Sequence, residues 1–218
     1  MKRFRLVLIL IIFFNTLTSI FAQFTEAPHL NECIEQVSEY IASDNFGQLK
    51  SELKITEVID TLFLYTKELC NNDISETLLV LTFASLPYHS IPMNEPFTGT
   101  IIRLPLPSVS IDLFRKKLNN LPSNIFFNSS NIASDKDKLA HFFGNSFLAY
   151  NFSLFNLSKF MSIFVELFEN SFKVEGAVDF RDLQVNMLGE NFGLLLREND
   201  DILPSQLFAS YYLFYTTF

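Results

Sequence analysis

The stretch Asp137-Lys138-Leu139-Ala140-His141-Phe142 decides how the last third of this chain is interpreted. In it, and again in Asp182-Leu183-Gln184-Val185-Asn186, charged and amide side chains recur at one-turn spacing inside otherwise apolar helical patterns. Burying such groups costs several kcal/mol unless they satisfy one another or bind something. We therefore expect helices whose polar residues form either a site or a buried network.

Asp137 and His141 are four residues apart and share one face of a predicted helix over 135–152. A carboxylate that hydrogen-bonds one imidazole nitrogen fixes the tautomer of the ring and raises its basicity, which suits a general base or a metal ligand. The alternative is an ordinary helix start, with Asp137 at the positive end of the helix dipole.

Glu166 and Glu169 lie three residues apart in a second predicted helix, over 157–172. Like charges at this spacing repel unless a cation or a shared proton lies between them. Together with His141 they are candidate ligands for a divalent metal ion, the one cofactor that the sequence suggests. The alternative is that only one of the two glutamates points inward.

A third predicted helix, over 180–197, carries Asp182 and Asn186 on one face, with Gly189 and Gly193 continuing along nearly the same face. A Gly-x-x-x-Gly ridge lets a neighbouring helix approach closely, and we expect it to serve packing. The candidate catalytic residues are therefore His141, Asp137, Asp182 and Asn186.

The first residues predict export. Met1 to Arg5 is basic, Leu6 to Phe14 is an unbroken apolar run, and the following segment ends in the small residue Ala22. This order is typical of a secretory signal peptide, with cleavage near Ala22. The apolar run is short for the ~20 residues of a membrane span, so a retained anchor is the less favoured alternative. We expect a periplasmic or extracellular protein.

Cleavage would remove Lys2, Arg3 and Arg5 and leave 13 basic residues against 24 acidic ones, which changes the formal charge from −8 to −11. So acidic a chain is not expected to bind nucleic acid, whose phosphates attract basic proteins. The apolar stretch 142–157 carries several Asn and Ser residues, which disfavours a membrane span. A peripheral contact with envelope lipid stays open.

Cys33 and Cys70 are the two cysteines of the chain, and both fall in predicted helices. In an oxidising compartment an even count permits a disulfide between neighbouring helices. We therefore predict a Cys33–Cys70 bridge, with two buried thiols as the alternative. Their spacing does not indicate a metal site.

Apolar spacing predicts a mainly α-helical protein organised as a helical bundle with a Pro-rich irregular connector. The signal peptide covers 1–22, and a helical N-terminal unit covers 23–85, with helices over 28–43, 53–71 and 74–84. Asp73 is the expected cap of the last of these helices, and Glu76 in its first turn favours the helix N-terminus. Six of the eight prolines fall in the connector, 86–133, which has a short extended segment at 98–104 and room for a helical turn after Ser110. The C-terminal bundle covers 134–218, and a short helix is expected after Pro204.

The order Asp137-Lys138-x-x-His141, then Glu166-x-x-Glu169, then Asp182-x-x-x-Asn186-x-x-Gly189 resembles the VanZ-like and YfiM-type predicted periplasmic lipoprotein families. The resemblance covers about residues 134–197. It implies a small helical bundle in the cell envelope and no settled activity. The chain departs from these families in having no lipid-anchoring Cys at the cleavage point and no strongly apolar spans.

We therefore expect an exported cell-envelope helical protein with a buried Asp/His/Glu/Asn cluster. One alternative is a metal-dependent hydrolase or transferase that acts on an envelope lipid or glycan. In that case His141 is the base or a ligand, the glutamates hold the metal ion, and Asn186 orients the substrate. The other alternative is a purely structural or interaction bundle in which the cluster fixes the register of the helices.

Overall fold

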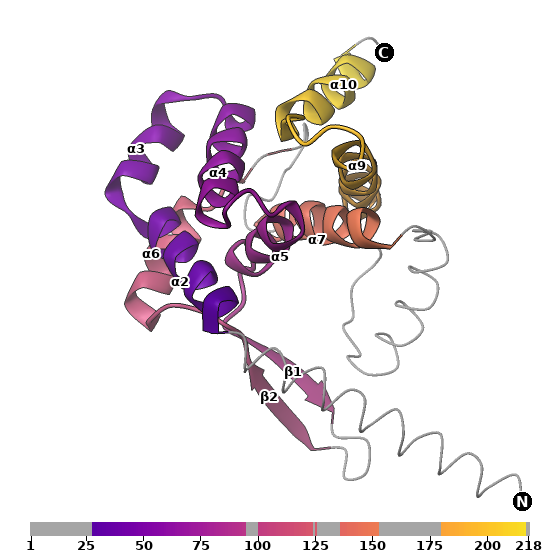
Figure 1. Ribbon diagram of the computed structural model, residues 1–218. Helices are drawn as coiled ribbons and strands as arrows, with labels where there is room; N and C mark the ends of the chain where they lie inside the picture. Colours follow the sequence, from indigo (N-terminus) through magenta and orange to yellow (C-terminus); the bar gives the residue numbers. More distant parts are fainter. Residues whose placement is uncertain (1–27, 95–99, 124, 126–135, 153–179, 217–218) are drawn as a thin grey trace, which may run out of the picture. The chain divides into compact units, whose positions relative to one another are not determined.

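The computed structural model describes residues 28–94, 100–123, 125, 136–152 and 180–216 (Figure 1). The chain divides into two compact units, 1–32 and 33–218, and the boundary falls inside a single helix. Of the first unit only residues 28–32 are described, and they form the first turn of that helix. The other described residues belong to the second unit.

The protein is mainly helical, as predicted, and the described residues form eight helices and one two-stranded sheet. The helices are α2 (Pro28–Ala42), α3 (Asp44–Glu52), α4 (Ile55–Leu69), α5 (Ile74–Ala84), α6 (Ile111–Asn120), α7 (Lys138–Asn151), α9 (Phe180–Leu196) and α10 (Pro204–Thr216). The strands are β1 (Ser90–Asn94) and β2 (Ile101–Pro105).

Local capping explains where the N-terminal helices begin. Asp73 is the N-cap of α5, where its Oδ1 accepts a hydrogen bond of 2.9 Å from the backbone N–H of Glu76, and this confirms the predicted cap. Ser43 caps α3 in the same way, accepting from the N–H of Phe46 at 3.1 Å. The sequence did not predict α3, because its nine residues are mostly polar and only Phe46 is buried.

The short helix expected after Pro204 is α10, and Pro204 itself is its first residue. Proline is tolerated in a first helical turn, since the N–H that it lacks would have no partner inside the helix.

The connector is more regular than predicted among its described residues. β2 coincides with most of the expected extended segment, and β1 pairs with it antiparallel, with Pro92 opposite Arg103 (Figure 1). Pro92 concealed β1 in the sequence, because a proline cannot donate to a strand ladder; it is tolerated in a sheet of two edge strands. The expected helical turn after Ser110 is the ten-residue helix α6.

The core around the C-terminal helices is aromatic. Phe142 of α7 is fully buried, and its ring lies 5.2 Å from that of Phe192 in α9 and 4.9 Å from that of Phe208 in α10, measured between centroids. Phe192 in turn contacts Phe63 of α4 at 5.4 Å. These four rings hold α4, α7, α9 and α10 around one centre.

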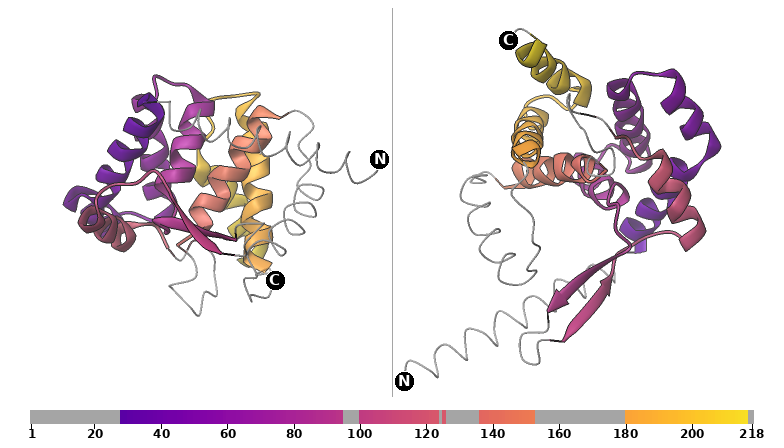
Figure 2. Two further views of the ribbon diagram at one scale, coloured as in Figure 1. Left: turned by 90° about the horizontal axis from the view of Figure 1, so that it is seen from below. Right: turned by 180° about the vertical axis from the view of Figure 1, so that it is seen from behind.

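α7 packs chiefly against α9 and, on another side, against α5 (Figure 2). A Cβ added at Gly189 would lie 2.2 Å from the carbonyl oxygen of Phe142, and one added at Gly193 would lie 2.2 Å from that of Ser146. The two backbones therefore touch where the glycines lie, which confirms the predicted packing role of the Gly-x-x-x-Gly ridge.

Within the described residues, no helix is long and apolar enough to cross a membrane. The predicted signal peptide over 1–22 and the predicted helix over 157–172 lie outside these residues.

Candidate functional site

Three side chains from α7 and α9 form a hydrogen-bonded network at the contact between the two helices. The Nδ2 of Asn145 donates both of its hydrogens, one to the backbone carbonyl of His141 at 2.8 Å and one to Oδ1 of Asn186 at 2.8 Å. Asn186 is almost completely buried, with 1% of its surface exposed. Its Oδ1 also lies 3.2 Å from Nδ1 of His141.

This network fixes the tautomer of His141. The backbone carbonyl of His141 can only accept a hydrogen bond, so the side-chain atom of Asn145 that faces it must be the amide nitrogen. The same nitrogen also donates to Asn186, so the Asn186 atom at this contact must be the oxygen. That oxygen can only accept, so the nitrogen of His141 that faces it must be a donor. Nδ1 of His141 therefore carries hydrogen, and Nε2 is the nitrogen that remains available as a base in the neutral ring.

The carboxylate of Asp137 lies beside both the His141 ring and the ammonium group of Lys138. Nε2 of His141 lies 3.9 Å from Oδ2 of Asp137, and the other carboxylate oxygen lies 3.2 Å from Nζ of Lys138. The Lys138 side chain is 2% exposed, whereas the His141 side chain is 39% exposed. The Asp137 charge is thus shared between a buried ammonium and an accessible imidazole.

An open groove of about 340 Å³ lies between α5 and α7 beside this network. Leu79, Phe83, Phe147 and Leu148 are among the apolar side chains that line it. His141 and Asn145 also line the groove, so the groove carries polar groups from α7 among otherwise mostly apolar walls. The Oδ1 of Asn145 is buried and has no hydrogen-bond partner among the described residues.

The structure thus brings together Asp137, His141 and Asn186 of the predicted catalytic set. Asp182 lies in the first turns of α9, and its side chain is outside the described part of the structure, as are Glu166 and Glu169. The predicted binding of a metal ion by His141, Glu166 and Glu169 therefore stays a prediction. Within the described residues, His141 belongs to no group of three potential metal ligands.

A second open hollow, of about 570 Å³, lies between the start of α4 and α10. It holds none of the predicted site residues, and several of its polar groups already have structural partners. The carboxylate of Asp60, close to the hollow, accepts from the N–H of Ser205 at 2.8 Å, and the hydroxyl of Tyr212 donates to the carbonyl of Ile125 at 2.5 Å. We therefore do not place a site there.

The predicted Cys33–Cys70 disulfide is absent, and both residues are buried free cysteines. The two side chains are nevertheless close enough for Cys33 to influence the Cys70 thiol. Burial, together with the nearby Cys33 and Glu76, raises the pKa of Cys70 to about 12. Because disulfide exchange proceeds through a thiolate, a thiol held protonated in this way is a poor partner for oxidation.

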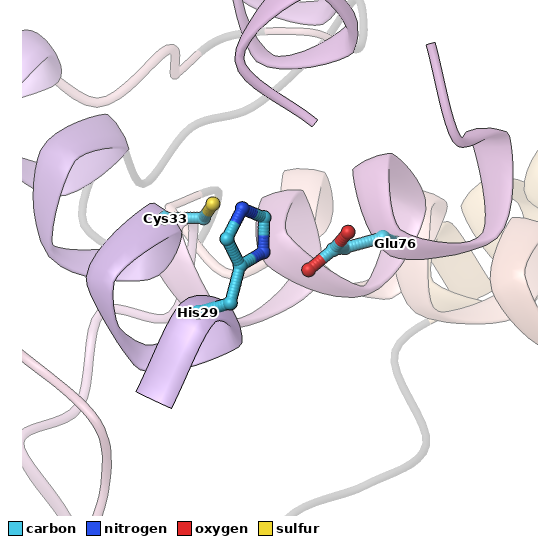
Figure 3. A group of neighbouring side chains, drawn as sticks. All are labelled: His29, Cys33 and Glu76. Atoms are coloured by element: carbon cyan, nitrogen blue, oxygen red, sulfur yellow. The ribbon is translucent and has the colours of Figure 1, made fainter. Parts of the chain in front are cut away.

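Three potential metal ligands meet at the same place: His29, Cys33 and Glu76 (Figure 3). Each offers one ligand atom, and all three atoms lie within 4.8 Å of one another. Sequence reasoning missed this group, because Glu76 was explained by the start of α5 and His29 was not considered. The available signal was the spacing His29-x-x-x-Cys33, which places both side chains on one helix face.

Comparison with known proteins adds no assignment, since no protein-family model, curated protein or solved structure matches this chain.

Proposed function

We propose that this protein is an exported helical protein of the cell envelope that binds a neutral, hydroxyl-bearing lipid in the groove between α5 and α7. The observation that carries this proposal is the groove itself. The groove is lined mostly by apolar side chains, and it also exposes one imidazole, that of His141, whose orientation is fixed by the protein. Binding sites for small molecules have this composition, with mostly apolar walls and a few oriented polar groups.

The walls of the groove suit an acyl chain. Each methylene that leaves water contributes about 0.8 kcal/mol, so even a partly enclosed chain supplies useful affinity. The groove lies near the lower end of the range of ~300–1,000 Å³ that is usual for ligand pockets. One chain is therefore a better fit than a large two-chain phospholipid.

The polar groups around His141 favour a neutral head group. Nε2 of the neutral ring accepts a hydrogen bond, and the Asp137 carboxylate beside it also accepts only. A hydroxyl of a glyceride or a sugar can donate to both. An anionic head group would meet the Asp137 charge and the strongly acidic chain, so phosphate and carboxylate lipids are disfavoured.

The predicted signal peptide and the resemblance to envelope families support this compartment. A catalytic role has less support. Ser146, the hydroxyl nearest in sequence to His141, is fully buried, and it donates to the carbonyl of Phe142 at 2.7 Å. It is therefore committed to the structure of α7 and is not available as a nucleophile.

Calorimetric titration of the purified protein tests the proposal, with monodecanoylglycerol as the ligand below its critical micelle concentration. Decanoate and glycerol are the comparison ligands, since they test the head group and the chain separately. We expect monodecanoylglycerol to bind best and glycerol alone not to bind. Decanoate binding as tight as that of monodecanoylglycerol would contradict the head-group assignment. If neither monodecanoylglycerol nor decanoate binds, the proposal is wrong.

Leu148→Asp places a charge in the groove wall, where desolvating it costs several kcal/mol. We expect monodecanoylglycerol to bind at least about tenfold more weakly to this variant. The matched control is Leu64→Asp, because Leu64 is an exposed leucine of α4. His141→Ala should weaken glyceride binding by about 3- to 10-fold, the value of one hydrogen bond, and leave decanoate binding unchanged.

A further inference from the structure

We propose that His29, Cys33 and Glu76, with Cys70 as the fourth ligand, form a structural binding site for Zn²⁺ at the meeting point of α2, α4 and α5. This inference does not depend on the lipid-binding groove, which uses other residues. It explains why a thiol, an imidazole and a carboxylate converge, with a second thiol beside them, in a chain that holds only two cysteines and three histidines.

The backbone positions of the ligands are set by regular structure. His29 and Cys33 lie one turn apart on the continuous helix α2, so they present their side chains to the same side. Cys70 is the C-cap of α4, and Glu76 lies in the first turn of α5, whose start is fixed by the Asp73 cap. Each ligand therefore comes from a position that a helix or a helix end holds in place.

The connection between α4 and α5 brings Cys70 and Glu76 near each other. Asn71 and Asn72 both have left-handed backbone conformations, with φ angles of 54° and 64°. Asparagine tolerates this region better than other residues that carry a side chain. Two such residues in succession reverse the chain within a few positions, so α5 begins beside the end of α4.

The separations between the ligand atoms are close to those of a tetrahedral zinc site. Zn²⁺ binds sulfur at about 2.3 Å and nitrogen or oxygen at about 2.0–2.2 Å, which separates tetrahedral ligand atoms by roughly 3.3–3.8 Å. The ligand atoms of His29, Cys33 and Glu76 lie within 4.8 Å of one another, so rotations of about 1 Å complete the set. Cys70 lies outside this group of three, but its thiol is close enough to Cys33 and Glu76 to interact with both, so we assign it as the fourth ligand after a side-chain rotation.

The donor set selects the ion. Two thiolates and an imidazole favour zinc over hard cations such as Mg²⁺ and Ca²⁺, which prefer oxygen ligands. Both cysteines are at most 2% exposed, whereas His29 is exposed and Glu76 is half-buried. The ion would therefore enter from the side of His29 and Glu76, and four protein ligands would leave no open position for catalysis.

The first experiment uses the wild-type full chain purified under reducing conditions. We expect it to bind one Zn²⁺ per molecule, and to show a thiolate-to-metal charge-transfer band when Co²⁺ replaces Zn²⁺. Removal of the ion with a chelator should lower the melting temperature, because binding to the native state alone stabilises it by mass action. A chain that binds no Zn²⁺, or that is isolated with a Cys33–Cys70 disulfide and no metal, would overturn the proposal.

The second experiment assigns the ligands. Cys33→Ser, His29→Ala and Glu76→Gln should each weaken Zn²⁺ binding by more than the 10- to 100-fold that is typical for loss of a residue that only hydrogen-bonds to a metal ligand. The matched controls are His89→Ala and Glu68→Gln, which alter an exposed histidine and an exposed glutamate elsewhere and should leave affinity unchanged. Circular dichroism of each variant checks its helix content. A wild-type Zn²⁺ affinity in folded His29→Ala and Glu76→Gln would contradict the assigned ligand set.

Discussion

At the scale of the residue, the cost of burying charge explains which polar side chains are paired. Lys117 of α6 is 1% exposed, donates from Nζ to the carbonyl of Leu86 at 3.2 Å and lies 4.9 Å from the ring centroid of Phe114. These partners do not replace the water that its ammonium would have outside. Desolvation therefore lowers the pKa of Lys117 to about 8.

The sign of this pKa shift makes a prediction about stability. A lysine whose pKa is lowered in the folded state binds its proton more tightly when unfolded, so its contribution opposes folding below pH 8 and fades between pH 8 and 10.5. At about 1.4 kcal/mol per pKa unit the effect amounts to a few kcal/mol. Lys117→Met should raise the free energy of unfolding at pH 7 and flatten its rise toward pH 10 in urea titrations. Lys116→Met, at the exposed neighbour, should do neither.

The Asn145–Asn186–His141 network makes a second prediction at this scale. Asn186→Leu keeps the approximate volume but leaves the amide of Asn145 and Nδ1 of His141 without their shared acceptor. We expect a loss of about 1–3 kcal/mol in the free energy of unfolding, the usual cost of an unsatisfied buried donor. Asn151→Leu, at an exposed asparagine of α7, is the control. If Asn186→Leu and Asn151→Leu have equal free energies of unfolding, the network is not buried as described.

At the scale of the element, the glycine ridge sets how closely α7 and α9 pack. Gly189→Ala and Gly193→Ala would each place a methyl group against a backbone carbonyl, which cannot rotate away. We expect each to destabilise the protein by at least about 1–3 kcal/mol. Gly47→Ala is the control, since a Cβ there meets only the side chain of Asn120 at 3.3 Å, and alanine favours a helix over glycine. Thermal unfolding of the three variants makes the comparison.

The sequence predicted the elements with strong local signals. The periodic apolar faces of α2 and α4 and the Asp73 cap of α5 depend on residues within a few positions of each other, so they can be recognised in a single chain. β1 and α3 were missed because Pro92 and a polar composition hide them. The meeting of His29 and Cys33 with Glu76 was missed because it depends on how α2 and α5 pack, which no local pattern encodes.

At the scale of the whole molecule, export is the prediction that governs the rest. If the basic start and the short apolar run form a signal peptide, the mature protein should begin at Gln23, give or take two residues. N-terminal sequencing of the exported protein checks this directly. A mature protein that begins at Met1 would remove the envelope from the proposed function.

The central claim, a lipid-binding groove between α5 and α7, can be tested most directly by photo-crosslinking. A monoacylglycerol that carries a diazirine at the end of its acyl chain would be bound to the purified protein and irradiated, and the modified residues would be mapped by mass spectrometry. We expect the label on the apolar walls of the groove, at Leu79, Phe83, Phe147 or Leu148, and we expect excess unlabelled monodecanoylglycerol to remove it. Labelling confined to the hollow between α4 and α10, or labelling that the competitor does not reduce, would contradict the claim.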